Sequence, residues 1–81
     1  MKREVIILSD LDLKLLEYIV EEKFIKDIFY EFDMNYVMIN RHLSRLRKLN
    51  AIDESKFGTF KEVKTNETGL IIIDILKNAR T

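Results

Sequence analysis

Four basic side chains lie close together near the middle of this chain of 81 residues. The segment from Met34 to Ile52 contains Arg41, Arg45, Arg47 and Lys48, and it contains no acidic residue. The part before this segment carries five basic and nine acidic side chains, and the part after it carries five of each. Guanidinium and ammonium groups bind phosphate, and arginine can also donate two hydrogen bonds to guanine. The cluster therefore has the chemistry to recognise nucleic acid.

The apolar residues of the same segment recur at helical spacing and share one face of a helix: Ile39, Leu43 and Leu46. Arg41, Arg45 and Lys48 fall on roughly the opposite face. A helix that packs on one side and is basic on the other has the shape that enters the major groove of DNA. The alternative is that Arg41 and Arg45 form ion pairs with acidic residues of the N-terminal half. We favour DNA contact because the neighbouring turns of this helix supply no acid.

No set of residues suited to catalysis or metal binding emerges. The chain has no cysteine, and His42 is its only histidine, so thiolate and histidine metal sites are not expected. His42 lies at the edge of the apolar face, where it would pack or face a phosphate. The neighbouring acids Asp10 and Asp12, and likewise Glu21 and Glu22, are typical of helix ends or solvated surface. We therefore expect a protein that is not an enzyme and that uses no cofactor or metal.

Size and composition indicate one small domain over residues 1–81. No apolar run is long enough to cross a bilayer or to act as a signal peptide, so a cytoplasmic (intracellular) location without membrane contact is expected. A charged fraction of 35% and the absence of Pro, Gln and Trp suit a source that grows at high temperature.

Local signals place two helices at the start of the chain and the basic helix after them. A capping pattern of Ser9 and Asp12 begins a helix from about Asp10 to Glu22, and a short helix follows from Phe24 to Phe32. The basic segment forms the third helix, from about Tyr36 to Leu49. Asp33 suits the turn before this helix, and Asn35 suits its N-cap. Asn50 suits the left-handed position after its C-terminal end.

Two extended runs, Ile52 to Phe57 and Phe60 to Thr65, follow and are joined by Gly58-Thr59, which suits a two-residue type II′ turn. Asn66 can cap a last helix from Glu67 to about Asn78. The expected fold is therefore mainly α with a small β-hairpin, an α+β domain with the element order α-α-α-β-β-α.

In this order, the segment IKDIFYEFDMNYVMINRHLSRLRKLNAID resembles the helix-turn-helix of winged-helix transcription regulators. Their third helix carries an R-H-L-x-x-L core, which begins here at Arg41. The segment VKTNETGLIIIDIL is similar to that family's strand, T-x-x-G step and closing helix, with Gly69 in the glycine position. The resemblance covers about Leu8 to Asn78 and is closest to small archaeal and archaeal-virus regulators of the MarR and ArsR kind.

The chain departs from the family pattern in two places. The usual glycines of the turn and of the helix exit are Asp33 and Asn50 here, and both residue types can adopt the required geometry. The wing is short, and Lys56 and Lys61 are the lysines that flank its tip.

The resemblance implies a winged helix-turn-helix, with the helix-turn-helix over about 24–50, the wing over about 52–65 and a C-terminal helix over about 66–78. It implies a sequence-specific regulator of transcription that binds double-stranded DNA as a homodimer on a palindromic operator. A small-molecule effector is not expected. The alternatives are a winged helix that binds another protein and an architectural protein that binds DNA without a preferred site.

The residues expected to contact DNA lie on the third helix, its N-cap and the hairpin: Asn35, Tyr36, Val37, Met38, Asn40, Arg41, Ser44, Arg45, Arg47, Lys48, Lys56 and Lys61. Arg41 and Arg45 suit base contact, and Val37 and Met38 suit thymine methyl groups. The simpler alternatives are that Asn35 only caps the helix, that one of the first helical residues packs on the second helix, and that the lysines are solvated charge.

The first and last helices carry more apolar residues than a small monomer can bury. A second copy of the chain would cover them through a two-fold interface: Leu11, Leu15, Tyr18, Ile71, Ile72, Ile75 and Ala79. The segment from Val5 to Leu8 is expected to add to this interface.

Overall fold

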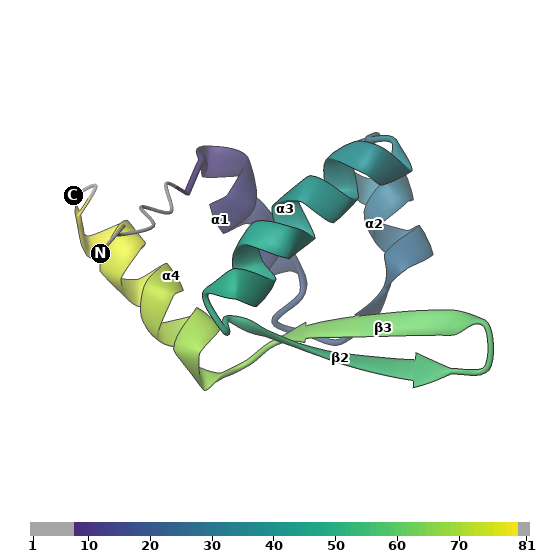
Figure 1. Cartoon of the computed structure of the whole chain (residues 1–81). Helices are drawn as coiled ribbons and strands as arrows, with labels where there is room; N and C mark the ends of the chain where they lie inside the picture. The colour runs from purple at the N-terminus through teal and green to yellow at the C-terminus, as the bar shows by residue number, and fades with distance from the viewer. Residues whose placement is uncertain (1–7, 80–81) are drawn as a thin grey trace, which may run out of the picture.

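The computed structural model describes residues 8–79, so the part of the expected interface at residues 5–7 lies outside the described residues. Residues 8–79 form a small α+β domain with four helices and a three-stranded antiparallel sheet. The elements follow in the order α1 (Asp10–Tyr18), β1 (Lys23–Phe24), α2 (Ile25–Phe32), α3 (Tyr36–Lys48), β2 (Ile52–Phe57), β3 (Phe60–Thr65) and α4 (Glu67–Ala79). Figure 1 shows α4 at one end of the molecule and the hairpin of β2 and β3 extending toward the other.

The helix starts confirm the expected caps. Ser9 Oγ accepts a hydrogen bond from the Asp12 backbone N–H (3.2 Å), and the Asp12 carboxylate accepts one from the Ser9 backbone N–H (2.9 Å), which completes the capping box of α1. Asn35 Oδ1 accepts a hydrogen bond from the Met38 backbone N–H (2.9 Å) at the start of α3. Each bond satisfies a backbone donor that the helix itself leaves without a partner.

The two residues that stand in for glycine adopt the left-handed backbone conformation. Asp33 ends α2 with φ 47°, and Asn50 follows α3 with φ 56°. The backbone N–H of Asn50 donates to Arg47 O (3.0 Å), and that of Ala51 donates to Leu46 O (3.0 Å), which is the Schellman pattern of hydrogen bonds. The chain therefore leaves both helices sharply without a glycine.

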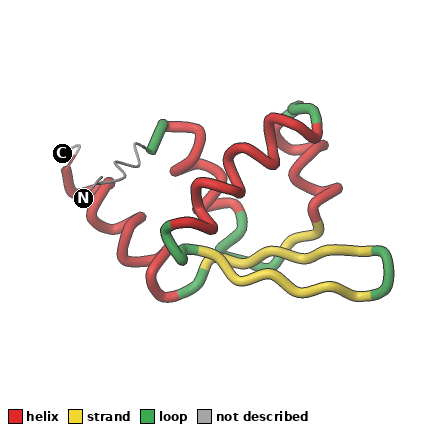
Figure 2. Tube along the Cα trace, in the orientation of Figure 1, coloured by secondary structure: helices red, strands yellow, loops and turns green. Residues whose placement is uncertain are grey.

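The hairpin has the expected bounds, and it belongs to a larger sheet than expected. Strands β2 and β3 pair from Ile52 with Thr65 to Phe57 with Phe60, and Gly58 has a positive φ of 59°, as a primed turn requires. The short strand β1 was not expected, and it pairs with β3 on the side away from β2. The yellow segments of Figure 2 follow this sheet beneath the red helices.

Helix α1 ends at Tyr18, although the apolar pattern predicted a helix to about Glu22. The end of β3 explains the difference, because Thr65 donates hydrogen bonds to two carbonyl groups at the end of α1. Its backbone N–H donates to Ile19 O (2.9 Å), and its hydroxyl donates to Leu16 O (2.7 Å). The chain then has to leave the helix in order to reach β3 as strand β1.

The core lies between the helices and the sheet. The predicted apolar face of α3 is confirmed, because Ile39, Leu43 and Leu46 have no exposed surface. From α1, Leu15 and Leu16 also have no exposed surface. Leu15 was expected in an interface with a second copy; this is corrected, because the side chain already lies in the core of its own chain. Among residues 8–79, no helix is both long and apolar enough to cross a membrane.

The N-terminal end of α4 approaches the backbone after α3 at Gly69. A Cβ atom at this position would lie 2.3 Å from Ala51 O and 2.4 Å from Thr65 Cγ2. The contact is held by the hydrogen bond from the Asn66 N–H to Ala51 O (3.0 Å). Only glycine fits here without displacement of the backbone of Ala51.

Substitution Gly69→Ala is expected to lower the free energy of unfolding by about 1–3 kcal/mol, because the added methyl group overlaps backbone atoms. In an open helix the same change would stabilise the protein by about 1 kcal/mol. Urea unfolding checks this, with the exposed neighbouring variant Thr68→Ala as the control. An unchanged or higher stability of Gly69→Ala would contradict the close approach.

Candidate nucleic-acid interface

The outward face of α3 presents four residues at helical spacing: Val37, Arg41, Ser44 and Lys48. They lie opposite the buried face of the helix. Val37, Arg41 and Lys48 are exposed, and Ser44 is half-buried. Within residues 8–79, the side chains of Arg41 and Lys48 form no hydrogen bond or ion pair with another residue. The structure therefore brings these four predicted residues together on one surface and leaves the two cations available to a ligand.

Arg45 points to the side of α3 and contacts α1. Its Nε lies 3.2 Å from Asp12 Oδ2, and its Nη2 lies 3.4 Å from Asp12 Oδ1. Asp12 has no exposed surface, and the side chain of Arg45 is 38% exposed. This is the alternative in which an arginine of the basic cluster pairs with an acid of the N-terminal half. DNA contact by Arg45 stays a prediction, and it would have to use the part of the side chain that Asp12 does not hold.

His42 completes the same cluster. The ring is buried, and its Nδ1 is hydrogen-bonded to Asp12 Oδ1 and lies 2.8 Å from Arg45 Nη2. The expectation that His42 packs at the edge of the apolar face agrees with this position. Residues 8–79 contain no group of three or more His, Cys, Asp or Glu side chains that could hold a metal ion.

Asp12 remains charged despite its burial. Burial raises the pKa of its carboxyl group, but the hydrogen bonds from the Ser9 backbone, His42 and Arg45 outweigh this, so that the pKa is lowered from its ordinary value. Of the two roles expected for Asp12, the one at a helix end is confirmed by the capping box of α1, and the side chain is buried and does not form part of the solvated surface.

Glu54 of β2 holds two more of the predicted cations. Arg47 Nη2 and Nε lie 2.6 Å and 3.0 Å from Glu54 Oε1, and Lys61 Nζ lies 3.1 Å from Glu54 Oε2. Burial raises the pKa of the Glu54 carboxyl group, but the hydrogen bonds from Arg47 and Lys61 outweigh it and lower the pKa. These ion pairs join the end of α3 to the hairpin, so Arg47 and Lys61 position the two elements.

The remaining predicted residues lie at the start of α3 and on the hairpin. Tyr36 and Met38 are 60% and 43% exposed, and Asn40 is half-buried. The ring of Tyr36 also packs at a tilt on Phe29 of α2, with 5.6 Å between the centroids. Tyr36 therefore contacts the second helix, as one alternative expected, and still exposes much of its side chain to solvent. Lys56 is exposed on β2.

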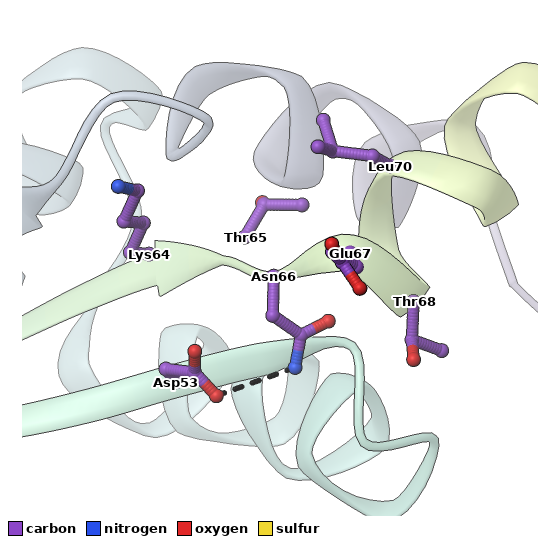
Figure 3. A pocket seen from close by; sticks show the side chains of 7 residues that line it. All are labelled: Asp53, Lys64, Thr65, Asn66, Glu67, Thr68 and Leu70. Carbon is purple, nitrogen blue, oxygen red and sulfur yellow. Dashed lines mark hydrogen bonds between the residues drawn. The ribbon is translucent and has the colours of Figure 1, made fainter.

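A separate hollow lies where β3 meets α4, away from the outward face of α3. It has a volume of about 540 Å³, and Asn66 lies at its centre among Asp53, Thr68 and Leu70 (Figure 3). Asn66 Nδ2 donates to Asn50 O (2.7 Å) and to Asp53 Oδ1 (3.3 Å), and its Oδ1 accepts from the Gly69 N–H. Asn66 Oδ1 thus caps α4, as expected from the sequence, and Nδ2 joins this end of the helix to the backbone after α3 and to β2.

Substitution Asp12→Asn is expected to lower the free energy of unfolding at neutral pH by about 1.5–3 kcal/mol, because charged hydrogen bonds to His42 and Arg45 are lost. The wild-type contribution is complete above the ordinary aspartate pKa of about 3.9 and is lost as the pH falls through the lower pKa of the folded state. The stability difference between the two proteins should therefore shrink on acidification below about pH 4.

Urea unfolding of both proteins from neutral to acidic pH measures this difference. Substitution Asp74→Asn at an exposed position of α4 is the control for loss of one carboxylate. A difference that stays constant down to low pH would contradict a stabilising charged form of Asp12.

The chain was compared with protein-family models, with curated protein sequences and with solved structures. None of the three comparisons gave a match.

Proposed function

We propose that this chain is a winged-helix protein that binds double-stranded DNA at specific sequences and regulates transcription as a homodimer. In this proposal α2 and α3 form the helix-turn-helix, α3 enters the major groove, and the hairpin of β2 and β3 is the wing. Two observations support this proposal: the order of the elements, and the outward face of α3, which no other element within residues 8–79 covers.

The observation that carries the proposal is the outward face of α3. Arg41 and Lys48 are exposed there without an internal partner in the described part of the chain, and α3 contains no acidic residue. Arg41 suits bidentate hydrogen bonds to guanine, Val37 suits a thymine methyl group, and Lys48 suits a phosphate. The other two arginines of the cluster already have carboxylate partners, so Arg41 is the proposed base-reading residue.

The hairpin offers a second point of contact with the DNA backbone. Lys56 and Lys61 lie directly opposite each other on β2 and β3. Like charges in this position repel unless an anion lies near them. Glu54 holds Lys61, and the exposed Lys56 would gain most from a phosphate.

Selection from a random pool of double-stranded DNA should enrich one palindromic sequence with the wild-type protein. For that sequence, Arg41→Ala is expected to bind about 5- to 150-fold more weakly and to lose preference at one base position, since a bidentate contact contributes about 1–3 kcal/mol. Affinity measured by fluorescence anisotropy should also fall steeply with rising salt.

The matched control is Lys14→Ala, which removes one exposed positive charge from α1. It should leave the preference unchanged. Binding without any enriched sequence would favour an architectural role, and no binding at all would contradict the proposal.

The proposed homodimer is based on the exposed apolar residues on the outer side of α4. Ile71 and Ile75 are each 60% exposed, and with the exposed Ala79 they recur every four residues along one side of the helix. Ile72 faces the chain's own core in part. We therefore place the centre of the two-fold interface at Ile71, Ile75 and Ala79, where a second α4 would cover the apolar side chains.

Substitution Ile71→Asp should shift the protein from dimer to monomer, because it would place two carboxylates against an apolar interface. Light scattering coupled to size-exclusion chromatography measures the mass, and the exposed variant Leu70→Asp, on another side of α4, is the control. A wild-type protein that is monomeric at high concentration would remove this part of the proposal.

One observation favours a protein partner as the second candidate function. Tyr36, Val37 and Met38 form an exposed, largely apolar group at the start of α3. Such a group, beside few unpaired cations, also suits a protein surface. In that case Arg41→Ala would leave partner binding intact, and the DNA selection would recover no sequence.

A further inference from the structure

A cavity of about 270 Å³ lies between α2, the start of α3 and the tip of the hairpin. Four aromatic rings and two lysines form most of its wall: Phe24, Phe29, Tyr36, Phe60, Lys26 and Lys61. None of the residues on the outward face of α3 lines it. It is therefore a site beside the outward face of α3, and it shares Lys61 with the hairpin surface proposed to meet the DNA backbone.

The aromatic rings form two tilted pairs. Phe24 and Phe60 have their centroids 5.8 Å apart at 60°, and Phe29 and Tyr36 have theirs 5.6 Å apart at 58°. Phe60 is 52% exposed and Tyr36 is 60% exposed, so two rings present much of their surface to solvent. A planar apolar ligand between these walls would remove that surface from water, and it would find ring faces and edges with which to stack.

The edge of the cavity is positively charged. Lys26 Nζ lies 5.2 Å from the centroid of Phe60 and 5.8 Å from that of Phe24. Within the described residues Lys26 forms no ion pair, whereas Lys61 is held by Glu54. The nearby carboxylate of Asp27 accepts a hydrogen bond from the Phe24 N–H, which ties it to the start of α2. The cavity thus joins stacking surfaces to one available ammonium group.

We propose that this cavity binds an unpaired nucleotide of single-stranded nucleic acid. The base would stack on Phe60 and the rings around it, and the adjoining phosphate would meet Lys26. Aromatic rings with a cationic edge are the combination that binds single strands without strong sequence preference, since every base has a π face. This binding is distinct from reading of duplex DNA by α3, because the two sites share no outward α3 residue.

The test measures binding of a fluorescent single-stranded thymidine oligonucleotide by anisotropy at low salt. Phe60→Leu keeps an apolar side chain but removes the ring, and it is expected to weaken binding about 5- to 100-fold, in the range of base–aromatic stacking. Tyr30→Leu is the matched control, because Tyr30 is 87% exposed on α2 and does not line the cavity. Equal affinities of Phe60→Leu and Tyr30→Leu would overturn the proposal, provided that both variants unfold cooperatively on heating.

A second probe separates stacking from attraction of charge. An abasic strand of the same length and charge should bind wild type more weakly than the thymidine strand, and Phe60→Leu should reduce this difference. Lys26→Gln should weaken binding of both strands. If both strands bind wild type equally, only charge is recognised and the proposal fails. Arg41→Ala should weaken binding of the selected duplex and not of the single strand, so failure of the duplex proposal and failure of this one give different results.

Discussion

The arrangement of α1 against α3 depends on the buried carboxylate of Asp12. A carboxylate without exposed surface is stable as an ion only when donors surround its oxygens. The Ser9 backbone N–H supplies one donor from the start of α1, and His42 and Arg45 supply the others from α3. The donors on α3 are three residues apart, so they lie on one side of the helix and fix its rotation about its axis. That rotation determines which residues of α3 face outward.

The same constraint divides the basic cluster into residues that hold the fold and residues that remain available. Arg45 compensates Asp12, and Arg47 compensates Glu54 together with Lys61. Loss of Arg45 would leave the buried carboxylate of Asp12 uncompensated, so Arg45 cannot turn outward without cost. The ion pair of Arg47 is more exposed and holds its cation less tightly. Within the described residues, the side chains of Arg41 and Lys48 form no ion pair that would hold them in this way. The count of positive charges on the segment therefore overstates the charge that α3 can offer to a ligand.

Features that depend on neighbouring residues could be predicted from the sequence. The bounds of the hairpin, the capping box of α1 and the left-handed residues Asp33 and Asn50 follow from local backbone preferences. Features that depend on distant contacts could not. The end of α1 is set by Thr65, which lies at the end of β3, and the role of Arg45 is set by an acid 33 residues earlier. An amphipathic pattern identifies the buried face of a helix, but it does not indicate which distant acid will meet its edge.

The ion pairs of Glu54 also connect the two surfaces for which functions are proposed. Arg47 lies in the last turn of α3, and Lys61 lies next to Phe60 on the hairpin, so one carboxylate links the helix to the hairpin, in addition to the pairing of β1 with β3. The aromatic cavity requires this placement, because its walls come from α2 and from the hairpin tip, with Tyr36 of α3 between them. If the hairpin tip moved relative to α2 and α3, Phe60 and Lys61 would move away from Phe29 and Tyr36, and the cavity would open. The outward face of α3 and the cavity therefore have a fixed position relative to each other. A duplex and an adjoining single strand would meet one surface of defined geometry.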